Sequence, residues 1–373
     1  MDPQPPLAGL RVIELARILA GPWAGQVLAD LGAEVVKIES PAGDDTRRWG
    51  PPFVADGDDA AYFHAANRGK SSRVIDFSTS AGRDEVRNLV RDADVVIENF
   101  KVGTLARYGL DHASLAAINP RVITCSITGF GQDGPYAERA GYDFVVQGLS
   151  GIMDLTGEPG GPPQKIGVAY ADILTGLYAV IAIQAALTER ERSGLGQHID
   201  MALLDVMVGT LANQAMNFLA SGIAPRRLGN AHPNIVPYEA FPTSDGWMIL
   251  AVGNDEQFRR FCGIVQLDVE PGWASNAGRI ADRERVSAAV SERTKRWARD
   301  ELLGRLDAAS VPAGPINTVA QAFADRQVRH RGMELALSNN DGETVAGVRL
   351  PIRFSRSPLA PPRRAPRLGE HVV

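Results

Sequence analysis

An aspartate at the start of a long apolar segment is the residue of this sequence best placed to do chemistry. Asp172 follows the glycine-rich stretch 129–171 and precedes the apolar run ILTGLYAVIAIQAAL. Aspartate at such a position commonly caps a helix and needs no catalytic purpose. A helix N-terminus also stabilises a carboxylate, which would keep Asp172 ionised at neutral pH and available as a nucleophile. The sequence leaves both interpretations open, a structural cap and a nucleophile.

Two glycine motifs that bind phosphates are present only in part. Gly69-Lys70-Ser71 ends like a P-loop, but His64 stands where that motif requires its first glycine. The dinucleotide pattern GxGxxG is met at 129–134, but Pro135 follows where a helix must begin. A nicotinamide dehydrogenase therefore stays a distant alternative, and we expect no resident nicotinamide or flavin.

Metal-binding and serine hydrolase patterns are not found either. The six histidines show no HExxH or HxH spacing, and Cys125 and Cys262 are far apart, so we expect no metal site. The segment 148–151 lacks one residue of the GxSxG elbow.

The composition is that of a globular protein with a balanced charge. The 373 residues are 45% hydrophobic and 22% charged, and the formal net charge is −5, which argues against a nucleic-acid partner. The apolar segment Leu174–Leu187 is shorter than the roughly 20 residues of a membrane span. Two cysteines without a pairing pattern fit a reducing compartment. We expect a cytoplasmic protein with no membrane association.

Strand and helix patterns alternate in the first half of the chain. Apolar runs at Arg11–Leu15 and Glu34–Glu39 flank a helical pattern at Pro22–Gly32, which predicts a βαβ unit. Further strands are expected at 71–77, 94–100 and 121–127, and helices at 82–93 and 104–119. This alternation predicts an α/β fold with a parallel sheet, whose ligands bind beyond the carboxyl ends of the strands.

The second half predicts helices and a smaller domain. Two apolar helices are expected at Ile173–Arg192 and Met201–Ala220, followed by a hairpin at 238–252. Later helices are expected at Asp255–Leu267 and Arg283–Ala309. The predicted organisation is a large domain (1–205 and 328–373), a linker with an active-site loop (206–237) and a small domain (238–327).

Several ordered phrases of the sequence carry a resemblance to a known family. They are RVIELARILAGPWAGQVLADLGAEVVKIESPAGDDTRRWGPPF, VIENFKVGTLARYGL, SITGFGQDGPYAERAGYDFVVQGLSGIMDLTG, GVAYADILTGLYA and GNAHPNIVPYEAF. The chain resembles the family III CoA-transferases, the group of formyl-CoA and carnitine CoA-transferases, over nearly its whole length. GDDTRRWGPPF and AHPNIVPYEAF look most similar to the succinyl-CoA:glutarate type.

This resemblance implies an architecture and a reaction. The expected architecture is a Rossmann-like large domain plus a smaller α/β domain, in an interlocked homodimer. The large domain is expected to bind CoA. The expected substrates are an acyl-CoA donor, namely succinyl-CoA or a similar dicarboxylyl-CoA, and a small carboxylic acid acceptor. Asp172 matches the family nucleophile, which forms a mixed anhydride and then an aspartyl-CoA thioester. Asp143, Tyr142 and His232 are expected to assist, with His232 in the short segment 229–232 that replaces the family's glycine-rich loop.

The resemblance also implies which residues contact CoA. They are Arg17, Leu19, Ala20, Arg68, Lys70, Asn99, Phe100, Arg107 and Tyr108. Arg17 and Arg47 are the two candidates for binding the distal carboxylate of a dicarboxylyl group, because a guanidinium pairs with a carboxylate through two hydrogen bonds.

Two other functions remain open on the same scaffold. The α-methylacyl-CoA racemases pair the aspartate with a histidine in a GHD phrase, because epimerisation needs a base and an acid on opposite faces of the carbon. This chain has Gly141-Tyr142-Asp143 there, and tyrosine is a poor base at neutral pH. A catalytically silent CoA-binding homologue is the second alternative.

Overall fold

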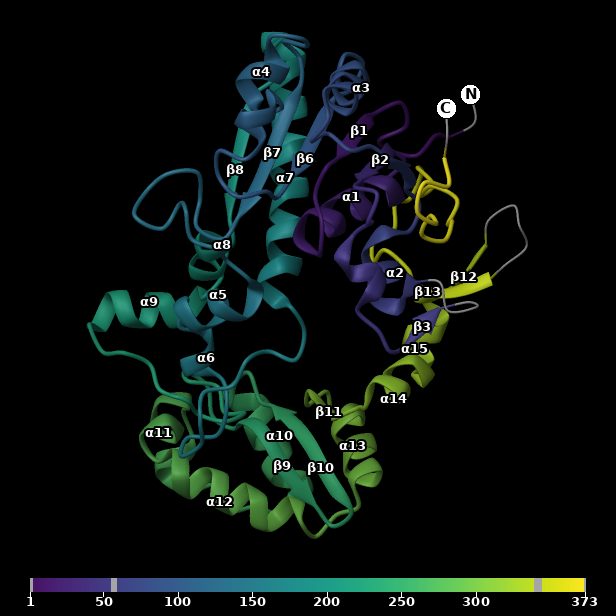
Figure 1. The fold of residues 1–373 in the computed structure, drawn as a ribbon. Helices are drawn as coiled ribbons and strands as arrows, with labels where there is room; N and C mark the ends of the chain where they lie inside the picture. Colours follow the sequence, from purple (N-terminus) through teal and green to yellow (C-terminus); the bar gives the residue numbers. More distant parts are fainter. Residues whose placement is uncertain (1–2, 55–58, 339–343, 372–373) are drawn as a thin grey trace. The chain divides into compact units, whose positions relative to one another are not determined.

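The computed structural model describes residues 3–54, 59–338 and 344–371. The chain divides into two compact units (Figure 1). The first comprises Met1–Ile152, Lys165–Ser221 and Arg326–Val373, and the second comprises Met153–Gln164 and Gly222–Asp325.

A six-stranded parallel sheet forms the centre of the first unit. Its strands lie in the order β5 (Ser71–Val74), β2 (Glu34–Glu39), β1 (Arg11–Glu14), β6 (Val95–Glu98), β7 (Ile123–Thr128) and β8 (His198–Ala202). The order runs outward in opposite directions from the adjacent strands β1 and β6. The loops that leave these two strands therefore diverge and open a crevice at the carboxyl end of the sheet.

Helices cover both faces of this sheet (Figure 1). Helices α1 (Ala20–Asp30) and α7 (Tyr170–Ser193) share one core cluster with Val12, whereas α3 (Ser80–Val90) and α4 (His112–Ala116) share another with Ile13. Successive residues of a strand point to opposite faces, so β1 is buried on both sides, as its apolar sequence predicts. The predicted α/β fold with a parallel sheet is confirmed.

Shorter elements complete the first unit. They are η1 (Asp45–Arg48), β3 (Phe53–Val54), β4 (Asp59–Ala60), α2 (Ala61–Asn67), η2 (Leu105–Tyr108), α5 (Asp143–Leu149), α8 (Leu203–Gly209), α9 (Ala212–Ser221), α15 (Arg326–His330), β12 (Glu334–Ser338) and β13 (Thr344–Val348). Helix α6 (Ile152–Leu155) lies where the chain passes into the second unit. The proline-rich C-terminal tail lies along the first unit, where Gly69 donates to the carbonyl of Arg363 at 3.1 Å.

The second unit has its own sheet and core. Its antiparallel strands lie in the order β11 (Ala313–Pro315), β10 (Gly246–Ala251) and β9 (Tyr238–Thr243), and β9 and β10 form the predicted hairpin. Phe241, Leu250, Phe258 and Leu302 belong to its buried core. Its helical elements are α10 (Asp255–Val265), η3 (Pro271–Trp273), α11 (Asn276–Ala281), α12 (Arg283–Thr294), α13 (Arg299–Ala308) and α14 (Val319–Ala324).

Three predicted helices are wrong in extent. The segment Met201–Ala220 begins in strand β8 and then forms α8 and α9, which are separated near Ala212, whose φ of 48° is left-handed. The predicted helix at 104–119 is interrupted at Gly109, which has a φ of 62°. The segment Arg283–Ala309 forms two helices, α12 and α13. The left-handed backbone at Ala212 and Gly109 cannot continue a right-handed helix, so it interrupts an otherwise continuous helical pattern at these two places.

Helix α7 is longer than the sequence indicates. Its 24 residues are long and apolar enough to cross a membrane by length and composition, although core helices of soluble proteins pass the same test. It packs against α1 and β7 and ends at Gly194, whose left-handed φ of 76° closes the helix. One face of α7, with Ala179, Val180 and Ile183, belongs to the core of the first unit.

Candidate active site

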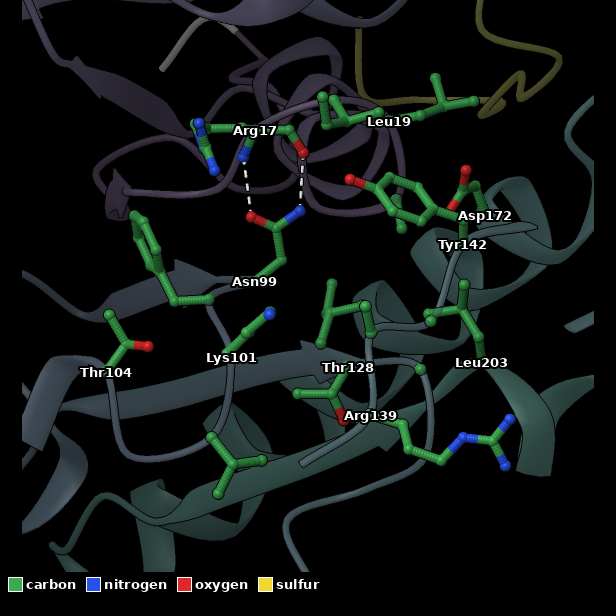
Figure 2. A pocket seen from close by; sticks show the side chains of 18 of the residues that line it. Arg17, Leu19, Asn99, Lys101, Thr104, Thr128, Arg139, Tyr142, Asp172 and Leu203 are labelled. Carbon is green, nitrogen blue, oxygen red and sulfur yellow. Dashed lines mark hydrogen bonds between the residues drawn. The ribbon is translucent and has the colours of Figure 1, made fainter. Parts of the chain in front are cut away.

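A cavity of about 320 Å³ opens in the first unit at the carboxyl ends of β1, β6 and β7. Its walls are the segment Arg17–Ala20 after β1, the segment from Asn99 to Thr104 after β6, the turn after β7, and parts of α7 and α8 (Figure 2). This is where a parallel sheet whose strand order reverses places its ligands. Seven of the predicted residues line it: Arg17, Leu19, Ala20, Asn99, Phe100, Tyr142 and Asp172.

Asn99 joins the loops that leave β1 and β6. Its Oδ1 accepts a hydrogen bond from the backbone N–H of Arg17 at 2.9 Å, and its Nδ2 donates to the carbonyl of Arg17 at 2.6 Å (Figure 2). The Arg17 guanidinium lies 5.7 Å from the centre of the Phe100 ring and pairs with Asp45 at 3.2 Å. The Arg17 side chain remains half exposed, so it can reach a ligand in the cavity.

Asp172 lies in the first turn of α7, but it is not the N-cap. The helix begins at Tyr170 and its N-cap residue is Ala169, which has no side chain able to cap. The side chain of Asp143 serves instead, because its Oδ1 accepts a hydrogen bond from the N–H of Ala171 at 2.8 Å. Of the two interpretations that the sequence left open for Asp172, the structural cap is therefore wrong, and Asp172 lines the cavity.

Burial and a second carboxylate raise the pKa of Asp172 to about 7. The burial of its side chain is the larger cause, and the charge of Asp143 adds to it. The sequence led us to expect full ionisation at neutral pH, whereas this pKa leaves the group about half ionised there. Titration close to neutral pH, in a cavity, is typical of groups that take part in chemistry.

Tyr62 is a neighbour of this carboxylate pair that the sequence did not indicate. Burial raises the pKa of its phenol, and the charges of Asp172 and Asp143 raise it further. The ring also packs edge-on against Trp49, with 5.3 Å between centroids. A protonated phenol near two carboxylates is a hydrogen-bond donor. No local pattern in helix α2 could have indicated this, because only the fold brings α2 near α7.

Two further cations line the cavity and were not predicted. They are Lys101, in the loop after β6, and Arg139, whose guanidinium lies 4.3 Å from the centre of the Tyr136 ring (Figure 2). Together with Arg17 they give the cavity three positively charged side chains, whereas Asp172 is the only acidic residue that lines it among the residues described. The cavity is thus suited to a polyanionic ligand.

Three predicted cations lie elsewhere, in buried ion pairs. The ammonium group of Lys70 is fully buried and lies 2.7 Å from Glu14, and Arg68 pairs with Asp30. Arg47 bonds Glu39 at 2.7 Å and Asp59 at 2.6 Å with only 6% of its side chain exposed. These three cations neutralise carboxylates within the first unit, and none of them lines the cavity.

The remaining predicted residues do not line the cavity either. Arg107 is exposed on η2, and the Tyr108 ring packs edge-on against Phe77 with 5.5 Å between centroids. His232 belongs to the second unit, where its Nδ1 accepts from the N–H of Asn234 at 3.0 Å. Across residues 3–54, 59–338 and 344–371, no group of three or more His, Cys, Asp or Glu side chains could hold a metal ion.

Comparison with known proteins identifies the family of this chain. The family model for CoA-transferase family III matches residues 7–372. A succinate–glutarate CoA-transferase of Agrobacterium fabrum is 58% identical, over 99% of this chain and 94% of its own length, and a human succinyl-CoA:glutarate CoA-transferase is 39% identical, over 99% and 84%. The crystal structure of a CAIB/BAIF family protein from Brucella suis, 60% identical, superposes with a TM-score of 0.89 over 99% of this chain and 98% of that chain. The chain belongs to CoA-transferase family III, as its sequence motifs indicated.

Proposed function

We propose that this CoA-transferase moves CoA from succinyl-CoA, or a similar dicarboxylyl-CoA, to a dicarboxylic acid, with Asp172 as the nucleophile. The observation that carries the proposal is a carboxyl group with a pKa of about 7 in a cation-lined cavity at the end of the sheet. Support for the substrate class comes from the relatives named succinate–glutarate and succinyl-CoA:glutarate CoA-transferase.

The proposed reaction has four balanced steps. The Asp172 carboxylate attacks the thioester carbonyl of the donor, forming a mixed anhydride and releasing the CoA thiolate. The thiolate attacks the Asp172 carbonyl, forming an aspartyl-CoA thioester and releasing the donor acid. An acceptor carboxylate then attacks this thioester, giving a second anhydride and the thiolate. The thiolate finally attacks the acceptor carbonyl, which yields the new acyl-CoA and frees Asp172. These steps require no metal, nicotinamide or flavin.

We assign the neighbours of Asp172 to supporting roles. Asp143 fixes the first turn of α7 through the N–H of Ala171, and its charge contributes to the raised pKa of Asp172. We propose that the phenol of Tyr142, which lines the cavity, donates a hydrogen bond to a carbonyl oxygen of the acyl group. Anhydrides and thioesters hydrolyse, so a site for this chemistry must also exclude water.

CoA is proposed to lie along the loops after β1 and β6. Lys101 and Arg139 are suited to its phosphates, because both line the cavity and neither is used in a buried ion pair of the described structure. Arg17 is our choice for the distal carboxylate of the acyl group. Arg47, the other candidate, is held by Glu39 and Asp59.

A homodimer is proposed from the family and from apolar surface on the first unit. Helices α5, α7 and α9 expose large apolar side chains, with Ile181 62% exposed and Leu219 71% exposed. Large apolar side chains exposed on helices in this number support a proposal that the first unit carries an interaction surface. The strand order of the sheet likewise supports our assignment of a Rossmann-like large domain.

Exchange of CoA between esters tests the proposed function. We expect succinyl-CoA and glutarate, or another acid from a panel of dicarboxylates, to give the new CoA ester and succinate when resolved by chromatography. Asp172→Ala should retain CoA binding and lose exchange. The matched control is Asp205→Ala, which alters an exposed aspartate in the first turn of α8.

The outcomes separate the alternatives. Unchanged esters with every acid would identify a silent CoA-binding protein, and epimerised 2-methylacyl-CoA would identify a racemase. Full exchange activity in Asp172→Ala would remove Asp172 from the mechanism.

A further inference from the structure

A cluster of four buried charges lies beneath the loop that leaves β1, and the proposed chemistry does not use it. The side chains of Glu14, Lys37, Asp44 and Lys70 have no exposed area. The Nζ of Lys37 lies 3.1 Å from Glu14 and 2.9 Å from Asp44, and the Nζ of Lys70 lies 2.7 Å from Glu14. Two acids and two cations balance, so the cluster has no net charge.

The loop above this cluster has a conformation that its own sequence disfavours. Ile18 has a φ of 71°, in the left-handed region that a β-branched residue rarely adopts. Leu19, the N-cap residue of α1, makes no capping bond with its side chain. Such a conformation persists only where the surrounding structure imposes it. Groups from other elements must therefore hold the loop.

Three side chains hold three successive residues of the loop. Lys37 donates to the carbonyl of Ala16 at 2.8 Å, and Asn99 binds both the N–H and the carbonyl of Arg17. The N–H of Ile18 donates to both carboxylate oxygens of Asp44, at 3.3 and 3.2 Å. Asp44 thus contacts the peptide group of the strained residue itself.

Asp44 is itself fixed and charged. Its carboxylate accepts hydrogen bonds from the N–H of Thr46 at 3.0 Å and from the Thr46 hydroxyl at 2.8 Å, and its own N–H donates to Glu39 at 2.9 Å. Burial acts to raise the pKa of Asp44, but the Lys37 charge and the bonds from Thr46 outweigh it and lower this pKa below its usual value. Asp44 is therefore a rigid ionised acceptor at neutral pH.

We infer that Asp44 is a positioning residue, which together with Lys37 holds residues 16–18 in the conformation that shapes the wall of the cavity. The inference rests on the proposed CoA binding, since Arg17, Ile18, Leu19 and Ala20 line the cavity. Without the Asp44 carboxylate, the Ile18 backbone leaves the left-handed region, and the loop no longer holds one fixed conformation at the wall of the CoA-binding cavity.

Hydrogen exchange and kinetics of Asp44→Asn test this inference. The asparagine keeps the shape and one acceptor oxygen but loses the charge. We expect amide exchange of a peptide spanning residues 15–20 to become at least about fivefold faster, and KM for succinyl-CoA to rise about tenfold with a much smaller change in kcat. The control is Asp30→Asn, which breaks the Asp30–Arg68 ion pair in the same unit and should change neither quantity.

A second substitution isolates the strain at Ile18. Glycine adopts the left-handed region without strain, so in the Ile18→Gly background Asp44→Asn should raise KM at most about threefold. Because Asp44→Asn leaves one excess buried positive charge, the double variant Lys37→Met with Asp44→Asn restores neutrality and protects folding. Amide hydrogen exchange of residues 15–20 in this Lys37→Met, Asp44→Asn variant should also be faster than in the unaltered protein.

Two results would overturn the inference. One is an unchanged rate of hydrogen exchange in residues 15–20 of a folded Asp44→Asn variant or of the folded Lys37→Met, Asp44→Asn variant. The other is a rise in KM on Asp44→Asn that is equal in the Ile18 protein and in the Ile18→Gly protein. If the unaltered protein turned over no CoA ester, the proposed function would fail, but the exchange experiment would still decide the role of Asp44.

Discussion

The charge of Asp143 sets part of the pH dependence of this enzyme, and Asp143→Asn measures that part. The pKa of Asp172 is raised to about 7 first by burial and second by the Asp143 charge. Asparagine retains an oxygen that can accept the Ala171 N–H, so the first turn of α7 keeps its bond while the charge disappears. Burial remains, so we expect the acid limb of kcat/KM to move about one pH unit lower.

The magnitude follows from the ionised fraction of the nucleophile. With its pKa at about 7, the ionised fraction of Asp172 at pH 6 is about one tenth, and a one-unit shift raises it to about one half. After normalisation at pH 8, kcat/KM at pH 6 should therefore be about fivefold higher in Asp143→Asn than in the unaltered protein.

Steady-state exchange between pH 5 and pH 9 provides the assay. The 3′-phosphate of CoA also titrates in this range, so the difference between the two proteins carries the test. Asp205→Asn is the matched control and should leave the profile unchanged. An acid limb that stays in place, or moves to higher pH, in Asp143→Asn would refute the electrostatic coupling of the two carboxylates.

Three further predictions concern single side chains. The fold raises the pKa of Asp172, so the ionised carboxylate destabilises the folded protein above about pH 7, and this penalty disappears as the pH falls to about 4. Asp172→Asn should therefore raise the Tm by a few degrees at pH 8 (roughly 1–2 kcal/mol) and leave it unchanged at pH 4. Equal Tm values of the two proteins at pH 8 would contradict this. Lys101→Met should raise KM for succinyl-CoA about three- to tenfold, and the rise should be smaller at high salt. Lys295→Met, which alters an exposed lysine, should leave this KM unchanged. Equal effects of the two substitutions would contradict phosphate binding by Lys101. Arg17→Met should lower kcat/KM for succinyl-CoA at least about tenfold and spare acetyl-CoA, and equal losses would exclude a distal-carboxylate role.

Local patterns in the sequence located the sheet and the aspartate at the start of α7. Strand β2 has the predicted bounds, Glu34–Glu39, because its β-branched residues Val35, Val36 and Ile38 give a local apolar signal that can be recognised without knowledge of the neighbouring strands. Strand β8 was missed although polar and apolar residues alternate in its sequence HIDMA, because it has only five residues and its last two, Met201 and Ala202, run directly into the apolar sequence of α8.

The partners of charged residues could not be predicted from local patterns. Lys70 lies in an NRGKSS phrase that suggests an exposed phosphate ligand, and its burial against Glu14 depends on the pairing of β2 with β5 and on the packing of α1 against α2. Lys101 and Arg139 lie within phrases that carry the family resemblance, but no local pattern marks them as cavity residues, and only the fold brings them to the cavity that Asp172 lines. These residues are far apart in sequence, so spacing carries no information about their distance in space.

Chemical trapping of the acylated aspartate tests the central claim most directly. The protein is incubated with succinyl-CoA, quenched with borohydride and digested, and the peptide that contains Asp172 is sequenced by mass spectrometry. We predict that the Asp172 side chain is reduced to a primary alcohol, as expected for an anhydride or thioester, and that neither Asp143 nor Asp205 is altered. An unmodified Asp172 in protein that is actively exchanging CoA, or reduction at another carboxylate, would contradict the account.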